Sequence, residues 1–192
     1  MSFLRKSLNV VMAVSVMVLS INTLPVMADP VPAITITGLT GATLSYRIGS
    51  GAKVIDPVAV SITDGIITDL SGGVLTVTIT DPDVNPNDVL GILDTGSHIS
   101  VSGNAINYDS VQFATIHSGG TGAPLVIYLN AGATPDNVAV LLNNISYTNS
   151  SFASVALRTV NFFLSDDNGN QTDNTYNATI TLTRPGFHQL WG

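Results

Sequence analysis

Aliphatic and hydroxyl side chains alternate along several segments of the chain. In one of them, Leu75, Val77 and Ile79 are separated by threonines. Three further segments show the same alternation: 58–63, 159–165 and 177–183. Because successive side chains of a strand point to opposite faces, each segment predicts a strand with one apolar and one polar face. Clusters of glycine, asparagine, aspartate and proline separate the strands, so the sequence predicts an all-β fold in which two antiparallel sheets pack as a sandwich.

One segment departs from the strand pattern. Thr134 is a residue type that caps helices, and Pro135 and Asp136 suit the first helical turn. Apolar side chains then recur at helical spacing from Val138 to Ile145. We therefore expect one short helix that crosses between strands of the sandwich and leads into a further strand at Ile145.

Two adjacent phenylalanines lie in the predicted strand at 159–165. A strand turns one of these rings inward and the other outward, and the alternation places Phe162 inside and Phe163 outside. The outward face is rich in threonine and asparagine. We expect the short helix to cover Phe163, and the alternative is a ring exposed for contact with a partner.

The N-terminal segment has the parts of a secretory signal peptide. Arg5 and Lys6 supply positive charge, residues 8–19 form an uncharged apolar run, and Val26-Met27-Ala28 precedes a suitable cleavage site. The apolar run is short for a transmembrane helix. We predict cleavage after Ala28, no membrane insertion of the mature chain, and a periplasmic, secreted or cell-surface location. The alternative is an uncleaved membrane anchor.

Composition restricts the partners of the exported chain. Its thirteen acidic residues are all aspartates, and the net charge of the whole chain is −7. Nucleic-acid binding requires clustered lysine and arginine, so nucleic acid is excluded as a partner. Aspartate favours turns, whereas glutamate favours helices, which places most of these carboxylates in loops. Since the chain has no cysteine, its stability must come from a hydrophobic core.

Several sequence segments between residues 31 and 183 resemble a known structural repeat. The segments are Gly41-Ala42-Thr43-Leu44-Ser45-Tyr46, Val54-Ile55-Asp56-Pro57, Gly72-Gly73-Val74-Leu75-Thr76-Val77, Ala133-Thr134-Pro135, Leu141-Leu142-Asn143-Asn144-Ile145-Ser146-Tyr147 and Arg158-Thr159-Val160. Their order and spacing resemble the cadherin-like repeats of giant bacterial surface adhesins. The resemblance implies a Greek-key sandwich of immunoglobulin-like or cadherin-like type, with an adhesive or spacer role.

The resemblance also implies calcium ligands, of which this chain retains about half. Ile48 and Ile66 stand where the family has acids, and Asn168 stands where a second aspartate is usual. Two groups of oxygen-bearing side chains remain. The first is Asp81, Asp83 and Asp88, together with Asn85 and Asn87. The second is Asp64, Asp166 and Asn168, together with Asp69 and Asn170, which the family topology would gather at one end of the sandwich.

Short oxygen ligands at alternate positions can wrap a calcium ion, and the first group has this spacing. Turn statistics nevertheless favour an ordinary solvated loop for a stretch so rich in asparagine, aspartate and proline. We expect the chain to require no cofactor, and calcium is the one ion that the sequence offers a weak site.

The sequence gives no pattern that indicates catalysis. The histidines His98, His117 and His188 lie far apart, and the chain contains no Gly-x-Ser-x-Gly elbow. We predict a signal peptide at 1–28, one cadherin-like β-sandwich domain at 29–186 and a short aromatic tail at 187–192. The predicted function is a non-enzymatic exported adhesion module that binds a protein or cell-surface partner.

Two other functions stay open at this point. One is a structural subunit that assembles with itself into a surface layer or filament through exposed strand edges. The other is a small carbohydrate-binding domain, which would need exposed aromatic side chains, and the sequence has a single tryptophan and five tyrosines.

Overall fold

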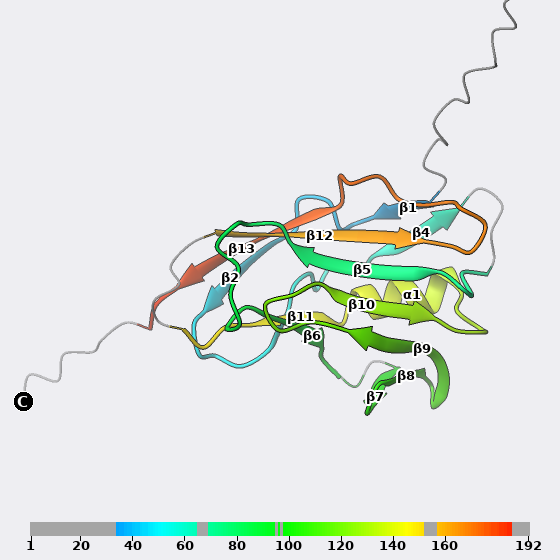
Figure 1. Cartoon of the computed structure of the whole chain (residues 1–192), viewed down its shortest axis with the longest axis horizontal. Helices are drawn as coiled ribbons and strands as arrows, with labels where there is room; N and C mark the ends of the chain where they lie inside the picture. The colour runs from blue at the N-terminus through cyan, green and yellow to red at the C-terminus, as the bar shows by residue number, and fades with distance from the viewer. Residues whose placement is uncertain (1–33, 65–68, 95, 97, 152–156, 186–192) are drawn as a thin grey trace, which may run out of the picture.

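The computed structural model of the chain describes residues 34–64, 69–94, 96, 98–151 and 157–185, which form thirteen strands and one short helix (Figure 1). The predicted signal peptide, Ile66 and the C-terminal tail lie outside the described residues. The elements are β1 (Ile34–Thr37), β2 (Thr43–Arg47), β3 (Lys53–Val54), β4 (Ser61–Asp64), β5 (Val74–Ile79), β6 (Val89–Ile92), β7 (Ile99–Ser102), β8 (Ala105–Tyr108), β9 (Val111–Ser118), β10 (Leu125–Leu129), α1 (Pro135–Leu142), β11 (Ile145–Thr148), β12 (Leu157–Ser165) and β13 (Asn177–Thr183).

The strands form two packed layers. An eight-stranded sheet, here called the large sheet, has the order β2-β13-β12-β5-β10-β9-β8-β7, and a three-stranded sheet, the small sheet, has the order β3-β11-β6. The remaining strands, β1 and β4, pair with each other in a two-stranded sheet. Neighbouring strands are antiparallel, except that β13 pairs with β2 in parallel. Figure 1 shows β12 and β5 in one layer and β11, β6 and α1 in the other. The predicted all-β sandwich with one short helix is confirmed.

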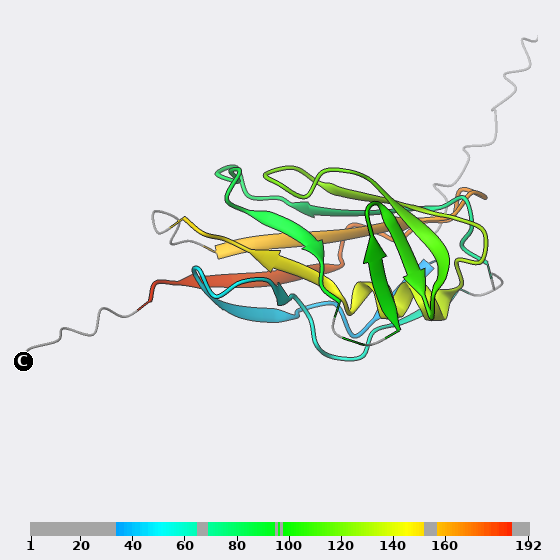
Figure 2. The same cartoon turned by 90° about the horizontal axis from the view of Figure 1, so that it is seen from below.

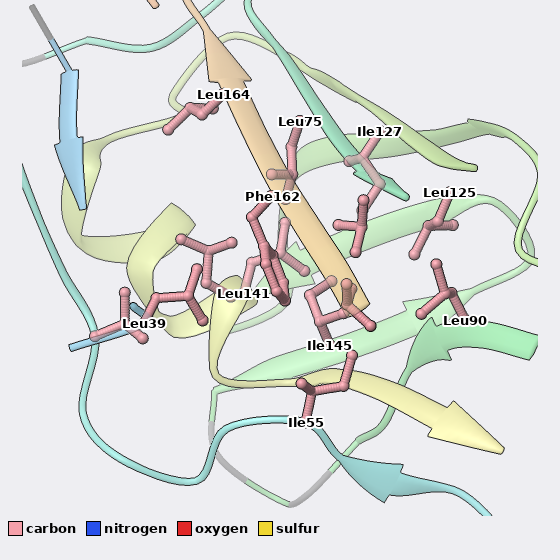
Figure 3. Packing of buried hydrophobic residues seen from close by; sticks show 14 of the residues in the cluster. Leu39, Ile55, Leu75, Leu90, Leu125, Ile127, Leu141, Ile145, Phe162 and Leu164 are labelled. Carbon is pink, nitrogen blue, oxygen red and sulfur yellow. The ribbon is translucent and has the colours of Figure 1, made fainter. Parts of the chain in front are cut away.

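The core lies between the two layers and follows the predicted alternation. Leu75, Val77 and Ile79 of β5 are buried, and the inward side chains of β12 and β13 join the same cluster. Figure 3 shows Phe162, Leu75 and Ile127 from the large sheet facing Ile145 from the small sheet and Leu141 from α1. One cluster of buried apolar side chains thus holds the described elements together.

The segment 58–63 is shorter as a strand than its alternation predicts, because β4 begins only at Ser61 and Val58 is 61% exposed. The amide of Asn143, which follows α1, takes the place of a neighbouring strand here. Its Nδ2 donates to the carbonyl of Val58 at 2.5 Å, and its Oδ1 accepts from the backbone N–H of Val60 at 3.2 Å. A side chain therefore satisfies backbone groups that the pattern had assigned to a sheet.

The predicted helix is confirmed from Thr134 onward. Asn137 Oδ1 accepts from the backbone N–H of Thr134 at 2.8 Å, and the Thr134 hydroxyl accepts from that of Asn137 at 3.4 Å, which caps the first turn reciprocally. The helix packs against β4. Among the described residues, no helix is long and apolar enough to cross a membrane.

The expectation that α1 covers Phe163 is wrong. The side chain of Leu141 shares the core with Phe162, so the helix lies on the inner face of the large sheet (Figure 3). Phe163 points to the outer face, where it is half-buried opposite Thr76 of β5. The helix needs the inner face because that is where its own apolar side chains can be buried.

Candidate functional site

A network of buried polar side chains joins the two sheets around one carboxylate. Asp88 precedes β6 and is fully buried, and Arg158 of β12 is 1% exposed. Asp88 Oδ1 accepts from Arg158 Nε at 3.0 Å, from the Tyr147 hydroxyl at 2.5 Å and from Asn149 Nδ2 at 2.9 Å. Arg158 Nη1 also donates to both carboxylate oxygens of Asp83, at 3.1 and 3.2 Å. The guanidinium is thus clamped between two aspartates.

The charges of this pair stabilise each other despite their burial. Burial by itself would raise the pKa of the Asp88 carboxyl, but the hydrogen bonds from Arg158 and Tyr147 outweigh it, and the pKa lies below its ordinary value. Burial would likewise lower the pKa of Arg158, and its hydrogen bond to Asp88 outweighs that effect and raises it. Burial and the donation to Asp88 raise the pKa of Tyr147. Asp88 and Arg158 are therefore ionised and Tyr147 is protonated at neutral pH.

Tyr46 of β2 extends the network to the edge of the large sheet. Its ring meets the ring of Tyr147 edge to face, with centroids 5.1 Å apart. Its hydroxyl donates to the carbonyl of Gly51 at 3.0 Å and accepts from the backbone N–H of Asn149 at 3.1 Å. The network consequently ties β2 and β12 to β11 and to the loop before β6.

The first predicted group of calcium ligands converges on this network. Asp83 and Asp88 both bind Arg158, and Asp88 Oδ2 accepts from the backbone N–H of Asn85 at 3.1 Å. Asp81 Oδ2 accepts from the backbone N–H of Thr159 at 2.5 Å. The geometry assigns these three carboxylates to protein donors, and the Arg158 guanidinium is the cation of Asp83 and Asp88. Calcium binding here stays a prediction.

The second predicted group is organised around Asp166. Asp166 Oδ1 accepts from the backbone N–H groups of Asn168 and Asn170 at 2.9 and 2.8 Å, and its Oδ2 accepts from Asn170 Nδ2 at 2.7 Å. These bonds outweigh the effect of burial and lower the pKa of the carboxyl. They make Asp166 the centre of a closed turn.

Among the described residues, the other members of the second predicted group do not form a metal site with Asp166. Asp64 ends β4, where its backbone pairs with Ile34, and its side chain lies outside what the structure describes. The Asn168 amide donates to Asp167 Oδ1 at 3.0 Å, and the Asn168 side chain also helps to lower the pKa of Asp166. Within the described residues, no group of three acidic or histidine side chains gathers in a way that could hold a metal ion.

The outer face of the large sheet carries a second arrangement of side chains, which the sequence analysis did not predict as a site. Phe163, Thr76 and Val126 lie side by side on β12, β5 and β10. In the next row, Val74 lies beside Tyr128. The four apolar or aromatic members, Phe163, Val126, Val74 and Tyr128, are here called the outer-face patch. Tyr128 is 43% exposed and the other three are half-buried.

A β-bulge shapes one border of the outer-face patch. Between β9 and β10, Ile116 pairs with Ile127 but Ser118 pairs with Val126, so His117 is the extra residue. Its ring stacks on Tyr128, with centroids 4.2 Å apart and planes 19° from parallel. Bulges commonly redirect a side chain in this way next to functional sites.

A groove of about 420 Å³ lies between His98, the segment from Val54 to Ala59 and the C-terminal end of α1. The β7–β8 hairpin curls toward α1 (Figure 2), and His98, just before β7, lines the groove together with Val140 and Pro57. His98 Nδ1 lies 2.6 Å from Asp109 Oδ1, and these side chains are 56% and 60% exposed. The aspartate of a catalytic triad is buried where it orients its histidine, so this solvated pair has a different environment.

Comparison of the chain with family models, with curated proteins and with solved structures finds no match. The resemblance to cadherin-like repeats therefore rests on the sequence segments alone and stays a prediction.

Proposed function

We propose that this chain is a non-enzymatic exported interaction module that adheres to its partner through the outer face of the large sheet. The outer-face patch is the observation that carries the proposal. An antiparallel sheet with one solvated face normally presents polar side chains on it. Here three adjacent strands place Phe163, Val126, Val74 and Tyr128 on that face. A contiguous patch of this kind, bordered by threonine and serine, is typical of an interaction surface.

The bonding of buried charged side chains in the interior supports the same function. Two buried charged side chains, Asp88 and Arg158, are committed to each other, and Tyr147 and Asn149 complete the bonding of Asp88. The network rigidifies the sandwich, and we assign recognition of the partner to side chains on the surface. The partner class that we propose is a cell-surface or extracellular molecule, in keeping with the predicted signal peptide.

The test measures adhesion of the labelled mature domain to intact bacterial and animal cells and to immobilised matrix proteins. We expect wild type to bind at least one of these surfaces and Phe163→Ser to lose most of that binding, about tenfold or more, because buried aromatic anchors dominate interfaces. Leu157→Ser is the matched control, since Leu157 is 58% exposed on β12 outside the patch. Equal binding by the two variants, or no binding by wild type, would contradict the proposal.

A self-assembling structural subunit is the second candidate, and the edge strand β7 favours it. β7 ends the large sheet and pairs only with β8 within the described residues, and its sequence from Ile99 to Ser102 contains no charged residue and no proline. Such residues normally protect an edge strand from pairing with another chain. Sedimentation of the mature domain distinguishes the two functions. A concentration-dependent series of oligomers that Val101→Lys abolishes supports self-assembly, and a stable monomer refutes it.

A further inference from the structure

We propose that Tyr128 and His117 form the centre of a glycan-binding site, and that its ligands are neutral polysaccharides. The inference rests on the proposed function, because it names the class of partner that the outer-face patch recognises. Tyr128 is the most exposed member of the patch, and its ring is fixed by the stacked imidazole of His117. A fixed, partly exposed aromatic ring is a surface on which the apolar C–H face of a sugar ring can stack.

The backbone of β9 is built to hold this pair. His117 is the extra residue of one bulge, and β9 has a second register shift where it passes from Gln112 to Ala114 opposite β8. The two irregularities flank Thr115, which lies directly opposite Tyr128. Each one interrupts regular pairing and strengthens the local twist. Their position on both sides of Thr115 indicates that this part of the strand is shaped for the side chains that it presents.

Hydrogen-bonding side chains lie on one side of Tyr128, around Thr115, which is its partner on β9. Thr115 Oγ1 accepts from Asn130 Nδ2 at 2.8 Å and from Gln112 Nε2 at 3.0 Å. These contacts hold two amides and one hydroxyl in fixed positions next to Tyr128. Amide and hydroxyl groups both donate and accept, so together they match the hydroxyl groups of a sugar. Tyr128 thus presents an apolar ring with oriented polar groups beside it.

The charge pattern selects a neutral ligand. The chain has a net charge of −7, yet the rows that contain the patch have no charged member. The members of those rows are Phe163, Thr76, Val126, Ser118, Ser165, Val74, Tyr128 and Thr115. A nucleic acid or an acidic protein would need compensating cations here, and a basic protein would need carboxylates. A neutral glycan needs neither.

The size of the surface fits a chain of sugars better than a single one. The patch and its border run across β12, β5, β10 and β9, which are consecutive strands. With strands about 4.8 Å apart, the rows are about 14 Å long. This length accommodates several sugar rings laid across the sheet, so we expect polysaccharides to bind more tightly than monosaccharides.

The test is affinity electrophoresis of the mature domain through gels that contain dextran, xyloglucan, galactomannan or mixed-linkage β-glucan. We expect at least one polysaccharide to retard the wild type, Tyr128→Ala to remove the retardation, and His117→Ala to weaken it severalfold. Leu157→Ala should migrate like the wild type, and circular dichroism confirms that each variant is folded. No retardation of the wild type by any of the four, or equal retardation of Tyr128→Ala, would overturn the proposal.

The cell-adhesion assay separates this inference from the proposed function. If wild type adheres to cells and periodate oxidation of the cell-surface glycans abolishes adhesion, the glycan site is supported. If adhesion survives oxidation and still requires Phe163, the glycan site is refuted while the interaction module stands. A wild-type dimer that Tyr128→Ala converts to a monomer would identify the patch as a contact between two copies and would also refute the glycan site.

Discussion

Arg158 is the residue on which the interior of the domain depends most. Its guanidinium is almost fully buried, and it satisfies Asp88 with its Nε and Asp83 with its Nη1. Removing one member of a buried ion pair leaves the other charge uncompensated, which costs more than the pair itself contributes. The effect is large because both charges have already lost their hydration.

We expect Arg158→Met to reduce the free energy of unfolding by about 3–5 kcal/mol, because Asp88 then stays buried without its cation. Arg47→Met is the control, since Arg47 is exposed on β2, and its cost should be within about 0.5 kcal/mol. Urea denaturation of both variants gives the comparison. Equal stabilities would show that Asp88 is held by its other donors alone.

Acid should weaken the domain through the same carboxylate. Hydrogen bonding to Arg158 and Tyr147 holds the pKa of Asp88 below its ordinary value of 3.8 despite burial. A lowered pKa contributes stability that is complete above the unfolded value and is lost as pH falls through the folded value. The free energy of unfolding should therefore fall below about pH 4, and the fall should be shallower in Asp88→Asn. Parallel curves for the two proteins would mean that other groups cause the acid sensitivity.

The sequence pattern indicates that Arg158 is buried, and our sequence analysis did not predict this. Arg158 shares its strand face with Val160, Phe162 and Leu164, and an inward arginine requires a buried acid. The partner was not predictable, because Asp88 comes from a distant loop. The position of His117, in contrast, could not be predicted from local sequence. The bulge that presents its side chain results from the pairing of β9 with β10, and no local sequence pattern indicates it.

At the scale of elements, the alternation of side chains located the inner faces of β5, β12 and β13 correctly, and the capping residues located the start of α1. Local patterns succeed here because burial on one face is a property of consecutive residues. They failed at Val58, where the Asn143 amide replaces a strand, and at Phe163, where the position of α1 decides which face is covered. Both failures concern contacts between distant segments.

The connection from β9 to β10 offers an element-scale prediction. Gly119 has a φ of +89°, and a Cβ at this position would lie 1.6 Å from the carbonyl oxygen of Pro124. Gly119→Ala should therefore displace the connection and lower the melting temperature strongly. Gly41→Ala tests the backbone strain alone, because Gly41 has a φ of +80° and no atom within 4 Å of its Cβ position. We expect Gly41→Ala to cost only about 1–2 kcal/mol. Similar losses in the two variants would contradict the steric argument.

For the molecule as a whole, calcium should have little effect on stability. The carboxylates of Asp81, Asp83, Asp88 and Asp166 already accept hydrogen bonds from protein donors. Binding near millimolar affinity would add only about 1 kcal/mol at millimolar calcium. A thermal melt should shift by no more than a few degrees when excess calcium replaces a chelator. A rise above about 15 °C would reveal a tight structural site and contradict this assignment of the aspartates.

Hydroxyl-radical footprinting of the domain, free and bound to the surface that it adheres to, tests the central claim most directly. The account predicts that binding protects Tyr128, His117 and Phe163 from oxidation, because they form or border the outer-face patch. Labelling of Leu157 and His98 should stay unchanged. Protection of His98 with full labelling of Tyr128 would place the contact in the groove beside α1 and contradict the account.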